Sequence, residues 1–140
     1  MKLFVFTSFL VVLVVCSTDA KIYERCEFAK YLLSHGFNKN SIGTWSCIAY
    51  HESRYDTKAI NKNTWDYGIL QISSKYWCNQ GSRGCGITCN SLLTDDIAVD
   101  LKCARKVFDE TKRLKGNGFE AWTTYKNCRG DTSKYVKGCF

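Results

Sequence analysis

The sequence predicts a single α+β domain in which helices surround one small antiparallel sheet and disulfides cross-link the chain. Two segments with helical periodicity precede a short strand-like region and a third follows it, without the regular alternation of a parallel α/β fold. The chain has 140 residues, 45% of them hydrophobic and 14% aromatic, which suits one folded core. The chain has nine cysteines and no proline, and the cysteines can cross-link the domain through disulfides.

The N-terminal 20 residues are typical of a secretory signal peptide. An apolar run, Leu3–Val15, is too short to span a membrane comfortably. It is followed by small residues at Thr18 and Ala20, as before a signal-peptide cleavage site. Removal after Ala20 discards Cys16 and leaves residues 21–140 as one secreted, extracellular domain without a membrane anchor. An uncleaved anchor is the alternative interpretation.

Two helices are expected first. Apolar residues recur every three or four positions over Tyr23–His35, and Gly36 stands where a left-handed helix end is favoured. A second apolar face runs over Ser41–Tyr55, with Ser41 as the predicted N-cap.

The middle of the chain, at about residues 58–90, is predicted to form a small β subdomain. Turn-forming residues at Asn61–Thr64 precede the strand-like stretch Trp65–Ile72. Residues 76–90 are rich in Gly, Ser, Asn and Cys, so we expect a loop held by disulfides.

A third helix follows, with Thr94 as its predicted N-cap and two aspartates in its first turn, where the helix dipole favours acids. Its apolar face continues to Lys112 or Leu114, and residues 116–118 end it. A shorter helix is expected near Ala121.

Eight cysteines remain after signal removal, and in an oxidising compartment they predict four disulfides. These are Cys26, Cys47, Cys78, Cys85, Cys89, Cys103, Cys128 and Cys139. A zinc site is the alternative, but there is no CxxC pair and neither histidine adjoins a cysteine. Counting alone leaves 105 connectivities open.

Two carboxylic acids stand out as candidate catalytic groups. Glu52 lies late on an apolar helix, and Asp66 begins a strand after a turn. Each also has an ordinary interpretation, as an exposed helix glutamate and as a turn aspartate bound to its own backbone. A chain that turns back between them can bring the two together, and two carboxyls in unlike environments form an acid/base pair.

Several motifs, in order along the chain, carry a family resemblance: Cys47-x4-Glu52-Ser53, Asn61-x-Asn63-Thr64, Asp66-Tyr67-Gly68-Ile69-Leu70-Gln71-Ile72, Tyr76-Trp77-Cys78, Leu92-Leu93-Thr94-Asp95-Asp96-Ile97 and Gly116-Asn117-Gly118-Phe119-Glu120-Ala121-Trp122. With the eight cysteines, they resemble the C-type lysozymes of glycoside hydrolase family 22, most closely the insect branch. The resemblance covers essentially all of residues 21–140.

This resemblance implies a helical domain and a small β domain with a glycan cleft between them. It implies a muramidase that hydrolyses the β-1,4 bond between N-acetylmuramic acid and N-acetylglucosamine in bacterial peptidoglycan, with retention. No cofactor or metal is expected, and a monomer is the default because no apolar stripe is left over once the helices are buried. Glu52 would be the general acid and then the general base, and Asp66 the nucleophile or charge stabiliser. Lysozymes are themselves the standard example of this mechanism, so these roles come from the resemblance.

The resemblance also implies the disulfide pairs and the sugar contacts. The pairs are Cys26 with Cys139, Cys47 with Cys128, Cys78 with Cys89, and Cys85 with Cys103. The substrate-binding residues are Asn63, Gln71, Tyr76, Trp77, Ala121 and Trp122, with Trp122 forming the hydrophobic wall beside Glu52.

Four departures from the family pattern bear on the site. The turn before Asp66 is about three residues short, and Ser73 stands in the place of a common asparagine, so we expect fewer hydrogen-bonding groups around that carboxylate. The stretch from Cys103 to Trp122 is longer than usual, and Lys115 lies where an upper-cleft aspartate is often found. We therefore expect altered distal sugar subsites.

Two other functions compete. A non-catalytic glycan-binding or calcium-binding module, as in the lactalbumin branch, needs a cluster of aspartates, whereas Thr94 and Val99 stand at two of those places beside Asp96 and Asp100. A cationic membrane-active protein would kill without catalysis. The net charge of +7 suits an anionic bacterial wall and favours antibacterial defence over digestion. No motif indicates nucleic-acid binding.

Overall fold

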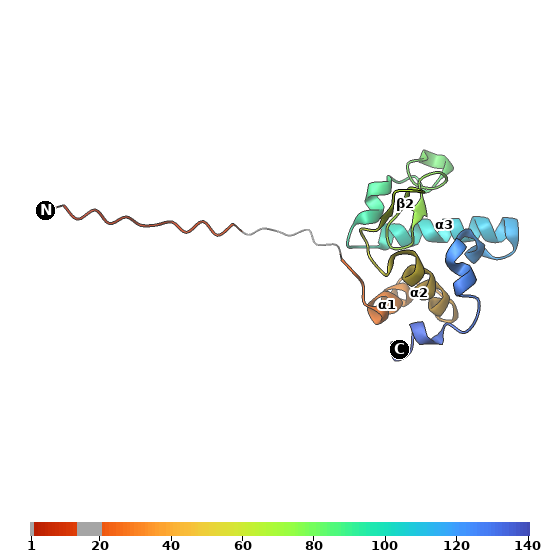
Figure 1. The fold of residues 1–140 in the computed structure, drawn as a ribbon. Coiled ribbons are helices and arrows are strands. Elements are labelled where there is room, and N and C mark those ends of the chain that lie inside the picture. Colours follow the sequence, from red (N-terminus) through yellow and green to blue (C-terminus); the bar gives the residue numbers. More distant parts are fainter. Residues whose placement is uncertain (1, 14–20) are drawn as a thin grey trace.

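The computed structural model describes residues 2–13 and 21–140, and the second range forms three helices around one small sheet (Figure 1). The helices are α1 (Arg25–Ser34), α2 (Lys39–Ser53) and α3 (Ala98–Lys115). Five short 3₁₀ helices are η1 (Gly81–Arg83), η2 (Cys89–Leu93), η3 (Gly118–Ala121), η4 (Thr123–Asn127) and η5 (Ser133–Tyr135). The predicted α+β class is confirmed.

The predicted signal peptide is only partly described. Residues 2–13 are exposed and carry no helix or strand, while the predicted cleavage position after Ala20 lies outside the described residues. Removal of the N-terminal 20 residues therefore stays a prediction. None of the helices in the described ranges is both long and apolar enough to cross a membrane.

The first two helices agree with their predicted periodicity, but the predicted cap of the second is wrong. α1 is followed by Gly36 in the left-handed conformation, at φ +77°, as expected. α2 begins at Lys39, because the side chain of Asn38 accepts a hydrogen bond of 2.9 Å from the amide of Asn40. The hydroxyl of Ser41 instead donates to the Asn38 carbonyl, at 2.7 Å.

α3 begins four residues after its predicted N-cap. The hydroxyl of Thr94 donates to the carbonyl of Asp96, at 2.8 Å, and the Asp96 carboxylate accepts from the amide of Ala98, at 3.0 Å. Asp96 thus satisfies the first free amide in place of Thr94. The helix ends before Gly116, at φ +82°, and the short helix expected near Ala121 is a pair of 3₁₀ helices, η3 and η4.

The sheet contains β1 (Ile60–Asn61), β2 (Asp66–Tyr67) and β3 (Ile72–Ser73) in the order β1-β2-β3, all antiparallel. Asp66 lies on the central strand, opposite Asn61 on one side and Ser73 on the other. In Figure 1 the sheet and the following loop lie above α3, and α1 and α2 lie below it. The candidate catalytic aspartate therefore lies on the central strand of this small sheet.

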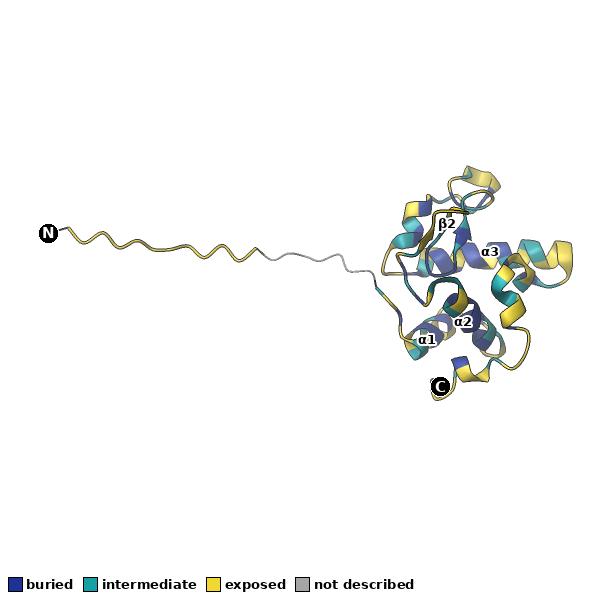
Figure 2. Cartoon of the chain, in the orientation of Figure 1, coloured by how far each residue is buried: buried dark blue, intermediate teal, exposed yellow. Residues whose placement is uncertain are grey.

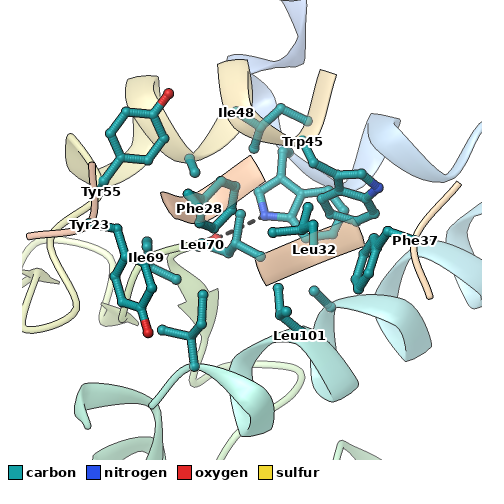
Figure 3. Packing of buried hydrophobic residues seen from close by; sticks show 14 of the residues in the cluster. Tyr23, Phe28, Leu32, Phe37, Trp45, Ile48, Tyr55, Ile69, Leu70 and Leu101 are labelled. Atoms are coloured by element: carbon teal, nitrogen blue, oxygen red, sulfur yellow. Dashed lines mark hydrogen bonds between the residues drawn. The ribbon is translucent and has the colours of Figure 1, made fainter. Parts of the chain in front are cut away.

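The core lies among the helices and reaches the turn between β2 and β3. Figure 2 shows the middle of α2 as buried and the C-terminal end of α3 as exposed. Trp45 is 3% exposed and contacts three aromatic rings edge-on, those of Phe37, Phe119 and Trp122, at centroid distances of 5.0–5.5 Å. Figure 3 shows Trp45 beside Phe37. This aromatic cluster joins α2 to the segment that follows α3.

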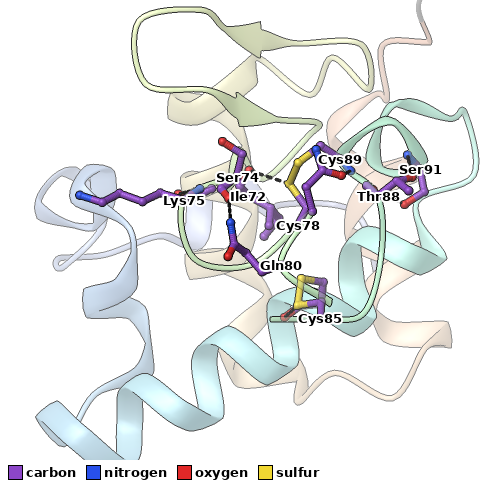
Figure 4. The surroundings of a disulfide bond; sticks show 12 residues. Ile72, Ser74, Lys75, Cys78, Gln80, Cys85, Thr88, Cys89 and Ser91 are labelled. Atoms are coloured by element: carbon purple, nitrogen blue, oxygen red, sulfur yellow. Dashed lines mark hydrogen bonds between the residues drawn. A yellow bond between two sulfur atoms is a disulfide. The ribbon is translucent and has the colours of Figure 1, made fainter. Parts of the chain in front are cut away.

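The four disulfide pairs implied by the resemblance are confirmed. Cys26–Cys139 and Cys47–Cys128 link α1 and α2 to the C-terminal part of the chain. Cys78–Cys89 closes the loop after the sheet, as Figure 4 shows, and Cys85–Cys103 fastens that loop to α3. The expected disulfide-held loop is therefore present, and it contains η1 and the start of η2.

Candidate active site

A cavity of about 190 Å³ lies between α2, the sheet and α3, and both predicted carboxylates line it. Its walls are Glu52, Asp66, Gln71, Ile72, Ser73, Tyr76, Trp77, Val107, Ala121, Trp122 and Thr123. These residues come from both the helical part and the β subdomain. The cleft that the resemblance implies is present between the two.

Glu52 is the penultimate residue of α2, and its neighbour fixes the end of that helix against the sheet. The hydroxyl of Ser53 lies 3.1 Å from the carbonyl of Ala49, in its own helix, and 2.7 Å from the carbonyl of Ile69, in the β2–β3 turn. Arg54 ends the helix in a left-handed conformation, at φ +55°. Glu52 therefore faces the strand that carries Asp66.

The environment of Glu52 favours its protonated form. Burial raises the pKa of this carboxyl, because the ionised form loses hydration. The hydroxyl of Thr124 donates to its Oε1 at 2.7 Å and lowers the pKa in part, while the negative charge of Asp66 raises it. The net direction is upward, as a general acid at neutral pH requires.

Trp122 also lines the cavity and is 5% exposed. Its indole Nε1 donates to the carbonyl of Leu70 at 2.9 Å, which is the dashed line that reaches Leu70 in Figure 3. Its ring also packs edge-on against Trp45, with centroids 5.2 Å apart. The same β2–β3 turn thus anchors both the end of α2 and this tryptophan.

Among the described residues, Asp66 accepts one side-chain hydrogen bond, so the expectation of few hydrogen-bonding groups around it is not contradicted. Thr64 donates to Asp66 Oδ2 at 2.6 Å. Trp65, between them, adopts a left-handed conformation at φ +55° and is half exposed. Ser73 lies opposite Asp66 in the sheet, but its hydroxyl accepts a bond from the amide of Lys75, at 3.1 Å.

Of the six predicted substrate-binding residues, five line the cavity. Tyr76 and Trp77 come from the β subdomain, and Ala121 and Trp122 come from the segment after α3. Gln71 also lines it, with its side-chain amide nitrogen donating to two backbone carbonyls of the sheet region, at 2.9 and 3.0 Å.

Asn63 is the exception. It is exposed in the β1–β2 turn, where its backbone amide donates to the side chain of Asn61 at 3.0 Å, and it does not line the cavity. Its role in binding substrate stays a prediction.

Two hydroxyl groups of the site were not predicted. Thr64 lies two residues before Asp66, and short polar side chains often bond at that spacing, so a local signal was present. Thr124 lies 72 residues from Glu52, and nothing in the local sequence connects them. Only the fold brings that donor to the carboxylate.

Within the described ranges, one cluster has metal-ligand types, namely Cys47, His51 and Cys128. Its two sulfur atoms are bonded to each other, so they are not thiolate ligands. At the family's calcium position, Asp96 accepts hydrogen bonds from Tyr31 and Ala98.

Comparisons with known proteins agree with the geometry. The model of the C-type lysozyme/alpha-lactalbumin family matches residues 21–139. Lysozyme c-1 of Anopheles gambiae is 42% identical over 97% of this chain and 99% of its own length. Lysozyme C of Scophthalmus maximus is also 42% identical, over 93% of this chain and 96% of its own.

A solved structure is similar as well. The crystal structure of a lysozyme from Litopenaeus vannamei superposes with a TM-score of 0.77 at 39% identity, covering 86% of this chain and 98% of that chain. The equal identities to the Anopheles and Scophthalmus proteins indicate the insect branch only weakly. The chain therefore belongs to the C-type lysozyme/alpha-lactalbumin family and is a glycoside hydrolase of the lysozyme kind.

Proposed function

We propose that this chain hydrolyses the β-1,4 bond between N-acetylmuramic acid and N-acetylglucosamine in bacterial peptidoglycan. One observation carries the proposal: Glu52 and Asp66 line a single cavity and lie in unlike environments. Glu52 is desolvated in the cavity that Trp122 also lines, whereas the half-buried Asp66 accepts a hydrogen bond from the hydroxyl of Thr64.

Glu52 acts first as a general acid. Its proton passes to the glycosidic oxygen, the bond from that oxygen to C1 breaks, and the electron pair leaves with the departing sugar. Asp66 supplies negative charge on the other face of the ring and forms a bond to C1, giving a covalent glycosyl intermediate. Glu52, now ionised, then takes a proton from a water molecule. The oxygen of that water attacks C1, and the bond from C1 to Asp66 breaks. Because C1 has been displaced twice, its configuration is retained.

The walls of the cavity suit a glycan. Tyr76 is 60% exposed and presents a flat face, as does the half-buried Trp77 beside it. Because the amide nitrogen of Gln71 is already bonded within the sheet region, a sugar hydroxyl would meet its carbonyl oxygen. The backbone of Ala121 supplies the facing hydrogen bonds.

The biological role that fits is antibacterial defence by a secreted monomer. The charge of +7 attracts an anionic wall and raises the encounter rate at low salt. The N-terminal apolar segment provides the route of export.

The test is a turbidity assay on purified bacterial cell walls from pH 4 to 8. The full chain is produced in secreting cells and purified from the medium, where its mass shows whether residues 1–20 were removed. The Glu52→Gln variant, with the same four disulfides verified, is the matched control.

We expect the wild type to clear the suspension and Glu52→Gln to leave it turbid. Failure of a correctly bonded wild type to clear walls at any pH would replace the proposal with a non-catalytic glycan-binding module. Killing of intact bacteria that survives Glu52→Gln would point to membrane activity instead.

A further inference from the structure

The cleft continues beyond the catalytic cavity into a second hollow of about 470 Å³. The two share Tyr76, Trp77 and Ala121, so a bound polymer passes from one into the other. We call this second hollow the outer cleft. Its remaining walls are Arg83, Glu110, Thr111, Leu114, Lys115 and Glu120.

Two acidic and two basic side chains line the outer cleft, and among the described residues only the acidic ones are paired with an opposite charge. Glu120 is paired with Arg129, at 3.0 Å, and Glu110 lies 3.9 Å from Lys106. Both of these partner cations lie outside the lining of the outer cleft.

The two basic residues that do line the outer cleft lack such partners. Within residues 2–13 and 21–140, no carboxylate lies within 4.0 Å of Arg83 or Lys115. Both side chains are exposed. In the described ranges, the two cations that line the outer cleft therefore have no paired carboxylate, whereas both carboxylates that line it, Glu110 and Glu120, are paired with a cation.

These charges come from the two sides of the cleft. Arg83 ends η1, within the loop that Cys78–Cys89 closes, and Lys115 is the last residue of α3. The left-handed Gly116 stops the helix at that position. Leu114, 72% exposed, adds an apolar surface beside Lys115. A glycan in the outer cleft thus contacts a cation from each subdomain.

We infer that Arg83 and Lys115 make the cleft selective for glycans that carry carboxylates, so that peptide-bearing peptidoglycan binds better than neutral N-acetylglucosamine polymers. This inference rests on the proposed function and names the feature of the substrate that the outer cleft recognises. In peptidoglycan every second sugar carries a lactyl group whose peptide ends in carboxylates, whereas chitin oligomers carry no charge.

The physical basis is charge-assisted hydrogen bonding at an exposed site. A bond from a guanidinium or ammonium group to a carboxylate is stronger than one to a neutral hydroxyl. Exposure keeps each contribution modest and makes it dependent on ionic strength. Two such contacts give about a threefold to tenfold effect on affinity at low salt.

The experiment measures dissociation constants in the Glu52→Gln background of the full chain, so that no turnover occurs. The probes are soluble peptidoglycan fragments with intact peptides and the neutral hexamer of N-acetylglucosamine. The test variant adds Arg83→Ala and Lys115→Ala. The control adds Arg113→Ala and Lys137→Ala, which remove the same charge from exposed positions outside both parts of the cleft.

The test variant should weaken binding of the peptidoglycan fragments about threefold to tenfold and change hexamer binding less than twofold. The loss should vanish at 0.5 M salt, where screening is nearly complete. Equal losses for both ligands, equal losses in the control variant, or no binding of the fragments would each overturn the inference. Turnover by the wild type is measured separately, so failure of the proposed function is recognised independently.

Discussion

The buried carboxyl of Asp100 should make the stability of this protein fall as the pH rises from 4 to 8. Asp100 is fully buried on α3, and neither of its carboxylate oxygens has a hydrogen-bond partner in the described part of the chain. The backbone amides of Asp100 and Ile69, although neither forms a hydrogen bond of normal geometry with the carboxyl, lower its pKa in part, and the like charge of Asp96 raises it. Burial raises the pKa of Asp100 to about 8.

The sign and size of the effect follow from the difference between folded and unfolded states. An unfolded aspartate has a pKa of about 4. Below that pH, Asp100 is protonated in both the folded and the unfolded protein, so its titration does not lower the free energy of unfolding. Between pH 4 and 8 Asp100 keeps its proton only in the folded protein, and each pH unit lowers the free energy of unfolding by about 1.4 kcal/mol. The sum is about 5 kcal/mol by pH 8, as large as the whole stability of a marginal domain.

Guanidinium unfolding of wild type and Asp100→Asn at each pH from 4 to 8 measures this. Asparagine is neutral throughout and nearly the same shape, so the free energy of unfolding of the variant minus that of the wild type should grow by about 5 kcal/mol over the range. Asp109→Asn, an exposed aspartate on the same helix, is the matched control. A difference that stays flat from pH 4 to 8 would refute the reasoning.

Three further predictions concern the site and its supports. Thr124→Val removes the hydroxyl that favours ionised Glu52, so the basic limb of the pH–activity profile should move to higher pH. Trp122→Phe leaves the Leu70 carbonyl without its donor and should lower the free energy of unfolding by about 1–3 kcal/mol in guanidinium titrations. Gly68→Ala should lower the free energy of unfolding, measured by thermal unfolding, by more than about 2 kcal/mol. The φ of Gly68 is +81°, and an added Cβ would lie 2.4 Å from the carbonyl oxygen of Leu92.

Each of these has a contradicting result. An unchanged or lowered basic limb in Thr124→Val would show that the hydroxyl does not act on Glu52. Trp122→Phe with wild-type stability would mean that water replaces the indole donor. Gly86→Ala, at φ +69° with nothing within 4 Å of an added Cβ, should cost only about 1 kcal/mol, and equal losses at the two glycines would contradict the steric argument.

The helices were predictable because their buried faces recur in the sequence, but their first residues were not. Ser41 and Thr94 are both good capping residues, yet Asn38 and Asp96 accept the first amide bonds instead. Several polar side chains near a helix start compete for the same amides, and the approach of neighbouring segments decides among them. Local propensity alone therefore fixes the helix and not its end.

The candidate site was predictable only in part. The residues suggested Glu52 and Asp66 as chemically interesting, and the family resemblance supplied their pairing and roles. Thr124 was missed because its partner is 72 positions away. Lys115 stood out as a departure, whereas Arg83 did not, because only the folded chain brings Arg83 into the same cleft as Lys115.

The disulfide between Cys26 and Cys139 encloses nearly the whole folded chain, with a sequence separation of 113. A protease that cuts any single peptide bond between these two cysteines leaves two pieces that remain covalently joined. Where the cut falls between Glu52 and Asp66, the bond from Cys47 to Cys128 holds the pieces together a second time. A single cut between Glu52 and Asp66 therefore places the two carboxylates on separate pieces, but two disulfides still join those pieces covalently.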